Sequence, residues 1–338
     1  MTAASRVVTY SPAYTLVPTY ECFNHCSYCN FRADPGKSPW LTLTDAEVQM
    51  RSLRPASVSL THPHPGAIEI LVLSGEVHPQ SLRRTAWFEH IYNLCELALT
   101  LDFLPHTNAG PLSRAEMERL KAVNVSMGLM LEQLTPALLQ TVHRQAPSKV
   151  PELRLQQLVW AGELQIPFTT GLLLGIGETD VDRQETLQAI ARIHEQWGHI
   201  QEVIVQPYRP GQSEVWNRSA FSAKNLVKTV AIARQLLPDD ITLQVPPNLI
   251  QEPDCLIACL EAGARDLGGI GPWDEVNPDY PHPLDVELAK ILAASGWQLV
   301  PRLPIYPHYD EWLSEPLKKL VTTWRSRIDN KPFLPFID

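Results

Sequence analysis

Residues 19–32 of the chain, TYECFNHCSYCNFR, hold three of its six cysteines within eight positions. Cys22, Cys26 and Cys29 are separated by three residues and then by two. On a helix the three cysteines would share one face. The residues between them are largely polar, however, and prolines flank the segment, so a loop is predicted instead. Three thiols on one loop indicate metal binding rather than packing.

Two metal centres suit these thiols. In a reducing compartment clustered cysteines are more often metal ligands or catalytic groups than disulfides. A structural zinc site normally has four ligands, and His25, the nearest candidate for the fourth, is adjacent to Cys26, which makes joint chelation awkward. An iron–sulfur cluster held by three thiolates instead leaves one iron open to a small molecule. The spacing favours such a cluster, with a zinc-stabilised binding or regulatory protein as an alternative.

The other three cysteines lie in different surroundings. Cys95, Cys255 and Cys259 occur inside apolar, helix-like stretches, and the last two are four positions apart. Free cysteine is commonly a buried, small apolar residue. We therefore expect these three side chains to be packed in the core.

The composition limits the classes of partner. The chain has 338 residues, 44% hydrophobic and 19% charged, which is typical of a globular protein. A net charge of −9 and a pI of about 5.7 disfavour binding to nucleic acid. No apolar run approaches the ~20 residues of a membrane span, and the N-terminus lacks a signal-peptide core. A cytoplasmic protein without a membrane or nucleic-acid partner is predicted.

Apolar, β-rich runs alternate with helical patterns along the chain, giving eight β-then-α units. The predicted strands are residues 14–20, 67–75, 103–108, 125–132, 167–177, 202–208, 241–247 and 265–271. Eight such units favour an α/β fold of the (βα)8 TIM-barrel type, in which chemistry occurs at the carboxyl ends of the strands. The cysteine loop follows the first strand and so falls on that face. An open, doubly wound sheet is the alternative, although it would favour a glycine-rich first turn.

The expected organisation is a single domain spanning residues 1–338, with a core barrel over about 8–300 and a C-terminal extension over 301–338. Helix starts are predicted from two capping boxes, Thr44 with Glu47 and Ser113 with Glu116. Thr179 or Asp180 is expected to cap a third, longer helix. His62 and His64, flanked by prolines, are predicted to lie on a loop.

Tyr28 precedes Cys29 and completes the pattern Cys-x3-Cys-x-Tyr-Cys, which resembles the signature of the radical S-adenosylmethionine (SAM) superfamily. The resemblance implies a 4Fe–4S cluster with an open iron that binds the amino and carboxylate groups of SAM. It also implies reductive cleavage of SAM to methionine and a 5′-deoxyadenosyl radical. The cofactor supplies the difficult chemistry, and the protein orients and shields it.

Further positions match that superfamily. Ser74-Gly75-Glu76 follows the second predicted strand, where members usually carry Gly-Gly-Glu for the methionine ammonium. The serine departs from the pattern, but contacts made by the backbone survive if it tolerates the dihedral angles. The resemblance implies further contacts with SAM. They would be made by Gly175 and Gly177 at the end of the fifth predicted strand, by the carboxylate of Glu132 and by the guanidinium of Arg154.

Within the superfamily, the chain resembles the CofG subunit family of 7,8-didemethyl-8-hydroxy-5-deazariboflavin synthase. The resemblance covers residue 7 to beyond 300 and includes the stretches at 10–32, 106–110, 144–179 and 265–283. It implies cyclisation of 5-amino-5-(4-hydroxybenzyl)-6-(D-ribitylimino)-5,6-dihydrouracil to the deazaflavin chromophore of coenzyme F420, with loss of ammonia. The substrate would come from the sister enzyme CofH. The electron would come from a reductant such as ferredoxin or flavodoxin.

Strand ends supply candidate residues for that substrate. His106 or Tyr208 is expected to move a proton during ammonia loss. The candidates for binding the substrate are Asn108, Gln206, Asn248, Asp266 and Trp273. Another small-molecule radical SAM enzyme, such as a CofH-like tyrosine lyase or a menaquinone-pathway relative, is the alternative. A tRNA-modifying enzyme is less compatible with the acidic chain.

Overall fold

The computed structural model describes residues 6–53, 66–216 and 218–329. His62 and His64 lie outside these ranges. Eight parallel strands close into a barrel, because β1 pairs with β8 on one edge and with β2 on the other. The barrel strands are β1 (Val7–Leu16), β2 (Glu69–Leu73), β3 (Leu104–Asn108), β4 (Ser126–Gly128), β5 (Phe168–Leu174), β6 (Ile200–Pro207), β7 (Thr242–Gln244) and β8 (Asp266–Ile270). The predicted (βα)8 barrel is therefore confirmed, and the alternative of an open, doubly wound sheet is excluded.

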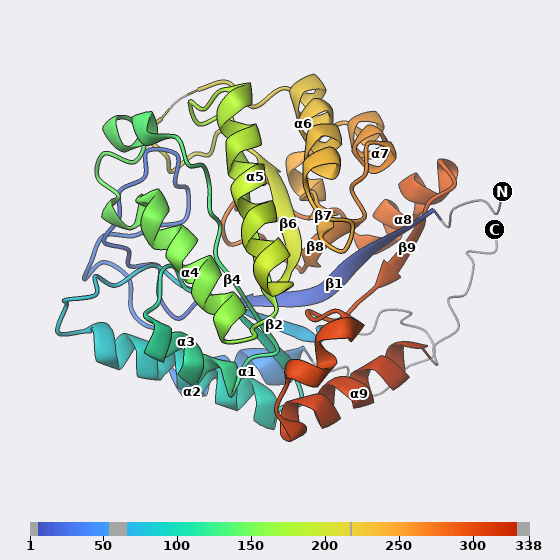
Figure 1. Cartoon of the computed structure of the whole chain (residues 1–338). Coiled ribbons are helices and arrows are strands. Elements are labelled where there is room, and N and C mark those ends of the chain that lie inside the picture. The colour runs from blue at the N-terminus through green and yellow to red at the C-terminus, as the bar shows by residue number, and fades with distance from the viewer. Residues whose placement is uncertain (1–5, 54–65, 217, 330–338) are drawn as a thin grey trace.

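Helices surround the strands (Figure 1). They are α1 (Leu43–Ser52), α2 (Arg84–Thr100), α3 (Arg114–Lys121), α4 (Pro151–Glu163), α5 (Asp180–Trp197), α6 (Ala223–Leu236), α7 (Pro253–Glu261) and α8 (Asp285–Ala294). Short 3-10 helices occur at Pro136–Gln140, Pro147–Lys149, Pro247–Leu249 and Pro307–Trp312. The predicted buried cysteines Cys95, Cys255 and Cys259 are all buried, on α2 and α7.

Two of the three predicted caps are confirmed. Ser113 forms a capping box with Glu116, and Thr179 caps α5. The Thr44 prediction is wrong: α1 begins after Thr42, whose hydroxyl accepts from the Asp45 amide at 3.0 Å. Thr42 and Thr44 are two positions apart, and the earlier threonine is the cap because Asp45 is its partner. The Asp45 carboxylate accepts the Thr42 hydroxyl proton at 2.6 Å.

The first strand differs from its predicted bounds of 14–20, because β1 covers Val7–Leu16. Its second half, from Ala13, pairs with β2, while its first half pairs with an additional parallel strand, β9 (Gln298–Pro301). Sequence patterns around Val7 gave no sign of this pairing, because its partner Gln298 lies almost 300 residues away. The predicted boundary between barrel and extension, at residue 300, falls inside β9.

The extension after β9 closes the amino-terminal end of the barrel. Leu303, Ile305 and Tyr309 form one buried cluster with Ile68 and Leu104, which lie where β2 and β3 begin. Complete burial of each such side chain contributes about 1.5–3 kcal/mol. The chain ends in α9 (Glu315–Asp329), drawn in red in Figure 1, which also packs on this cluster through Leu317 and Val321. The barrel is thus closed at this end, opposite the end where chemistry is expected.

Candidate active site

One cavity of about 360 Å³ runs from the carboxyl ends of the strands into the barrel. All but three of the predicted site residues line it: Cys22, Cys26, Tyr28, Cys29, Ser74, Gly75, Glu76, His106, Asn108, Glu132, Arg154, Gln206, Tyr208, Asn248 and Trp273. Gly175, Gly177 and Asp266 are not among the lining residues. The barrel has therefore gathered residues from most of its strand ends around one space.

The cysteine loop forms one wall of the cavity. All three thiols are free; Cys26 is buried, and Cys22 and Cys29 are partly exposed. Burial raises the pKa of Cys26 to about 12, against the opposing effect of the nearby Lys149 ammonium. Among the described residues, no three His, Cys, Asp or Glu side chains form a site for a single metal ion. In a multi-iron cluster each cysteine thiolate binds a different iron, so the three sulfur atoms need not converge on one point. The thiols of Cys22, Cys26 and Cys29 therefore fit such a cluster.

Asn24, which sequence reasoning missed, ties this loop to its surroundings. Its amide Nδ2 donates to Glu76 Oε2 at 2.9 Å, and its Oδ1 accepts from the Ser148 amide at 3.1 Å. The side chain is 2% exposed. Asn24 therefore joins the cysteine loop to the end of β2 and to the segment before α4. Its position between two cysteines was visible in the sequence, but a polar loop residue gave no sign of burial.

The end of β2 lies against the cysteine loop. A Cβ on Gly75 would lie 2.2 Å from the carbonyl oxygen of Glu21, so only glycine permits the approach. The Gly75 amide donates to the Thr19 carbonyl at 2.8 Å. This contact places the Glu76 side chain beside the thiols, where its carboxylate also accepts from Arg154 Nη2 at 3.3 Å.

Ser74 has a structural reason to replace the usual glycine. Its Oγ accepts from the indole N–H of Trp87 at 3.0 Å and donates to the Gly75 carbonyl at 2.9 Å. Trp87 is fully buried on α2, and a buried indole N–H needs an acceptor. Ser74 is not among the described residues with positive φ, so its backbone is unstrained. Its side chain is held between Trp87 and the Gly75 carbonyl.

Glu132 and Lys149 form a buried ion pair at the cavity. Glu132 has a φ of 65°, a left-handed conformation that is rare outside glycine and often marks a functional site. Burial would raise the pKa of its carboxyl, but Lys149 and Arg154 hold that pKa below its ordinary value. The pair is therefore ionised. Lys149 was not predicted; its only signal was a lysine between prolines in APSKVP.

Arg154 is 2% exposed and already engaged by the protein. Its Nε donates to the Ser148 carbonyl at 3.1 Å, and Nη1 donates to the Met130 carbonyl. With Nη2 on Glu76, the guanidinium positions that carboxylate. Together Lys149 and Arg154 bring two buried positive charges to the wall with the thiols, which suits an anionic cluster and a carboxylate ligand.

Tyr28 lies against His143, with its hydroxyl 2.8 Å from His143 Nε2 and the two rings in an edge-on contact. Burial lowers the pKa of His143 to about 4, so this histidine is neutral. Tyr28 is thereby fixed beside Cys29 as part of the cavity wall.

Gly175 and Gly177 form the turn after β5, with φ of 89° and 120°. Glu178 organises this turn: its carboxylate accepts from the Gly175 amide at 2.7 Å and from the Ile176 amide at 2.8 Å. Arg183 donates to the same carboxylate at 2.8 Å. The glycines shape the turn that follows Leu173, which does line the cavity.

His106 has a tautomer fixed by its neighbours. Ser126 Oγ donates its only proton to the Pro304 carbonyl at 2.6 Å, so it must accept from His106 Nδ1 at 2.7 Å. His106 Nε2 is then an unprotonated acceptor, close to Gly128, where an added Cβ would lie 2.9 Å away. Burial, aided by Arg302, lowers the pKa of His106 to about 3. This imidazole is neutral and can accept a hydrogen bond.

Tyr208 directs its hydroxyl toward Glu214 Oε1, to which it donates, and its ring contacts Trp216. Burial and the Glu214 carboxyl raise the pKa of Tyr208. The Tyr208 hydroxyl therefore keeps its proton, which it donates in a hydrogen bond to Glu214.

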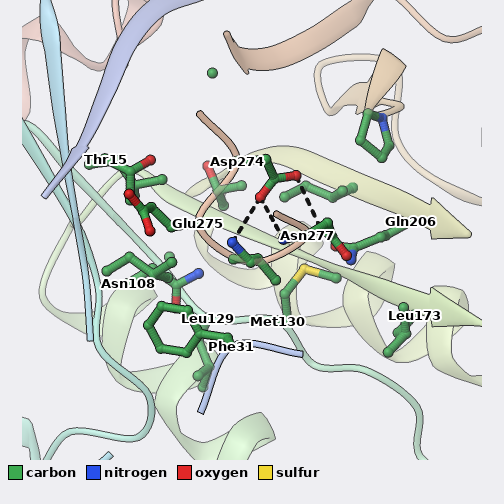
Figure 2. A pocket seen from close by; sticks show the side chains of 18 of the residues that line it. Thr15, Phe31, Asn108, Leu129, Met130, Leu173, Gln206, Asp274, Glu275 and Asn277 are labelled. Atoms are coloured by element: carbon green, nitrogen blue, oxygen red, sulfur yellow. Dashed lines mark hydrogen bonds between the residues drawn. The ribbon is translucent and has the colours of Figure 1, made fainter. Parts of the chain in front are cut away.

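Polar side chains from several elements point into the cavity. Figure 2 shows Asn108, Gln206 and Asp274 around the same space, with Asn277 hydrogen-bonded to Asp274. Asn248 donates both amide protons, to Asp274 Oδ2 at 2.7 Å and to the Tyr280 carbonyl at 2.9 Å. Its buried Oδ1 is left without a partner among the described residues.

Two predicted substrate residues differ in exposure. Trp273 is 70% exposed at the rim of the cavity, whereas Asp266 is fully buried. Asp266 accepts from Arg302 at 2.6 and 2.8 Å and from the Gly268 amide at 2.7 Å. Its carboxylate belongs to the ion-pair network inside the barrel.

Comparison with known proteins agrees with this geometry. The model of the radical SAM superfamily matches residues 16–190. A 7,8-didemethyl-8-hydroxy-5-deazariboflavin synthase of Trichodesmium erythraeum is 63% identical over 324 residues, covering 96% of this chain and 99% of that protein.

This chain belongs to the deazariboflavin synthase family of radical SAM enzymes. A synthase of the same name from Thermosynechococcus vestitus is 62% identical and covers 94% of this chain and 98% of its own length. The barrel is similar to the FeFe-hydrogenase maturase HydG of Carboxydothermus hydrogenoformans, with a TM-score of 0.69 at 19% identity, covering 97% of this chain and 79% of that one. It is also similar to methylornithine synthase, PylB, with a TM-score of 0.65 at 16% identity and coverages of 87% and 84%. These two likenesses concern the fold alone.

The family implies SAM and a 4Fe–4S cluster as cofactors. In the part of the chain that the structure describes, no helix has the length and apolar character needed to cross a bilayer.

Proposed function

We propose that this enzyme cyclises 5-amino-5-(4-hydroxybenzyl)-6-(D-ribitylimino)-5,6-dihydrouracil to 7,8-didemethyl-8-hydroxy-5-deazariboflavin, the chromophore of coenzyme F420, with loss of ammonia. The observation that carries the proposal is the 63% identity to a named synthase over 96% of the chain. The cavity adds chemical support, because thiols, buried cations and polar strand ends surround one space.

Cys22, Cys26 and Cys29 would hold the cluster and leave one iron for SAM. When bound, the cluster and SAM would supply radical chemistry, namely a 5′-deoxyadenosyl radical for hydrogen abstraction. Glu76 would accept from the methionine ammonium, and Ser74 and Gly75 would contribute backbone groups. Arg154 would keep Glu76 in place.

The other side chains of the SAM site would orient the ligand. Lys149 supplies positive charge for the SAM carboxylate, and Glu132 offers an acceptor on the same wall. Tyr28, and the turn that contains Gly175 and Gly177, would bound the adenosyl part. The closed end of the barrel and the buried cavity walls would limit the access of water to a reactive intermediate.

The substrate would lie in the same cavity, beside the SAM site. Asn108, Gln206 and Asn248 present amide groups there, and Trp273 would cover the mouth. His106 Nε2 is placed to accept a hydrogen bond or a proton, and Tyr208 with Glu214 forms a second proton-holding pair. We retain both as candidates for the proton transfers of ammonia loss. Asp266 would act only indirectly, through Arg302.

The partners follow from this reaction. CofH would supply the substrate, and ferredoxin or flavodoxin would supply one electron. The acidic chain favours no nucleic acid, and we place the enzyme in the cytoplasm, where thiols and the cluster stay reduced.

The test is anaerobic. Reconstituted enzyme is incubated with dithionite, SAM and the product mixture of CofH, and deoxyadenosine and the fluorescent deazaflavin are measured together. We expect both products from the wild type and from Cys255→Ser, and neither from Cys26→Ser. Cys255 is the matched control, because it is a buried cysteine on α7 outside the loop. Deoxyadenosine without deazaflavin would refute the proposed substrate and favour another radical SAM reaction.

A further inference from the structure

The cavity continues below the expected SAM site to the closed end of the barrel. Along β6, Glu202, Ile204 and Gln206 line the cavity at alternate positions, and Pro207 lines it at the strand's end. At about 3.3 Å per residue, Glu202 lies roughly 13 Å below Gln206. On β2 the deepest lining residue is Glu69, the first residue of the strand. The space is therefore deep enough for a ligand with an extended tail.

The bottom of this space, which we call the floor, is built rigidly by the C-terminal extension. Arg302 donates to both carboxylate oxygens of Asp266, at 2.6 and 2.8 Å, and forms an ion pair with Glu202. The Pro304 carbonyl accepts from Ser126 and from Gln201, at 2.6 and 3.1 Å. Arg302, Pro304 and Glu202 all line the cavity.

Several polar groups at the floor retain hydrogen-bonding capacity. His106 Nε2 is an acceptor, as the Ser126 contact requires. Gln244 is 9% exposed and lines the cavity, and no other described residue forms a hydrogen bond with its amide. Gly268 makes room for that amide, since a Cβ there would lie 2.2 Å from Gln244 Nε2. Glu69 adds a buried carboxyl group at the start of β2, and burial raises the pKa of that group.

The charge at the floor selects among ligands. One cation, Arg302, faces the three carboxyl groups of Glu69, Glu202 and Asp266, so no positive charge is left for a phosphate. An apolar tail would leave buried donors and acceptors unpaired, at a cost. Above the floor lie apolar side chains, including Leu71 and Ile204, which suit ring systems. Neutral hydroxyl groups, which both donate and accept, satisfy such a floor.

We infer that the floor of the cavity is a polyol subsite that binds the unphosphorylated ribityl tail of the substrate and rejects its phosphate ester. The inference rests on the proposed function, which supplies a substrate with such a tail. The rings would then lie in the apolar section, between the floor and the amide groups at the mouth. Glu69 and Gln244 would contact the tail hydroxyls.

The test uses reconstituted enzyme and fluorescent deazaflavins, with binding followed by fluorescence anisotropy. Three ligands are compared: the ribityl product, its 5′-phosphate, and an analogue with methyl in place of ribityl. We expect the ribityl compound to bind at least tenfold more tightly than either other ligand. Gln244→Leu should weaken ribityl binding about tenfold and leave the methyl analogue unchanged. Gln196→Leu, the same change on the exposed surface of α5, should alter neither.

Equal affinity of the wild type for the ribityl and methyl compounds would overturn the subsite, as would tight binding of the phosphate. These comparisons need no variant, so a folding defect of Gln244→Leu does not remove the test. Failure of all three deazaflavins to bind would instead refute the proposed function, and the subsite with it.

Discussion

Replacing Lys149 by methionine isolates the role of the buried ion pair. The side chains of Lys149 and Glu132 are only 12% and 8% exposed, and methionine has a similar length without the charge. Removing one member of a buried ion pair typically costs about 3–5 kcal/mol, because the other charge is left uncompensated. Arg154 still acts on Glu132, so we expect the lower end, about 3 kcal/mol, at pH 7.

The loss should depend on pH. In the wild type the pKa of Glu132 is held below its ordinary value, so the stability that this group contributes is present above the unfolded pKa and is lost as the pH falls. In Lys149→Met, we expect burial to raise the pKa of Glu132 above its wild-type value, because the largest opposing charge is gone. Protonation then removes the unpaired charge. The difference in unfolding free energy between the two proteins should be largest at pH 7 and smaller near pH 5.

Urea unfolding followed by tryptophan fluorescence at pH 7 and pH 5 measures this difference. The double variant Lys149→Met/Glu132→Gln should recover most of the lost stability, because it has no charge left to bury. Lys224→Met, at an exposed position of α6, is the matched control and should change little. A pH-independent loss, or a double variant as unstable as the single one, would refute the reasoning.

Three other predictions concern the site and its supports. Ser74→Ala should cost about 1–3 kcal/mol by leaving the Trp87 indole N–H unpaired, and the cost should vanish in a Trp87→Phe background while SAM affinity stays unchanged in equilibrium dialysis. Gly75→Ala should weaken SAM binding at least tenfold in the same assay, since its Cβ would displace the Glu21 backbone; wild-type affinity would contradict this. The pKa of His106 is about 3, so between about pH 3 and 6.5 the unfolded state binds more protons than the folded state, and the protein loses stability as the pH falls. His106→Gln should make the unfolding free energy depend less on pH when urea unfolding is measured from pH 7 to 4.5. An unchanged pH dependence in this variant would contradict the buried, neutral state of His106.

Local patterns determined much of this protein. The cysteine spacing in residues 19–32 indicates the radical SAM chemistry, because all three thiols lie within eight positions. Alternating strand and helix patterns predict the barrel, and in a barrel the residues after each strand meet at one end. For this reason Asn108 and Gln206, nearly 100 residues apart, were both placed at the cavity from sequence.

The tertiary structure alone decided which polar groups pair. Asn24 and Lys149 gave no sequence signal of their partners, and Arg302 meets Asp266 only because β9 returns to β1 after almost 300 residues. Sequence periodicity reports which face of an element is buried, over a few neighbouring residues. Which distant charge or hydrogen-bond partner a residue meets depends on how whole helices and strands pack. Such partners can therefore be identified only from the closed barrel and not from local sequence patterns.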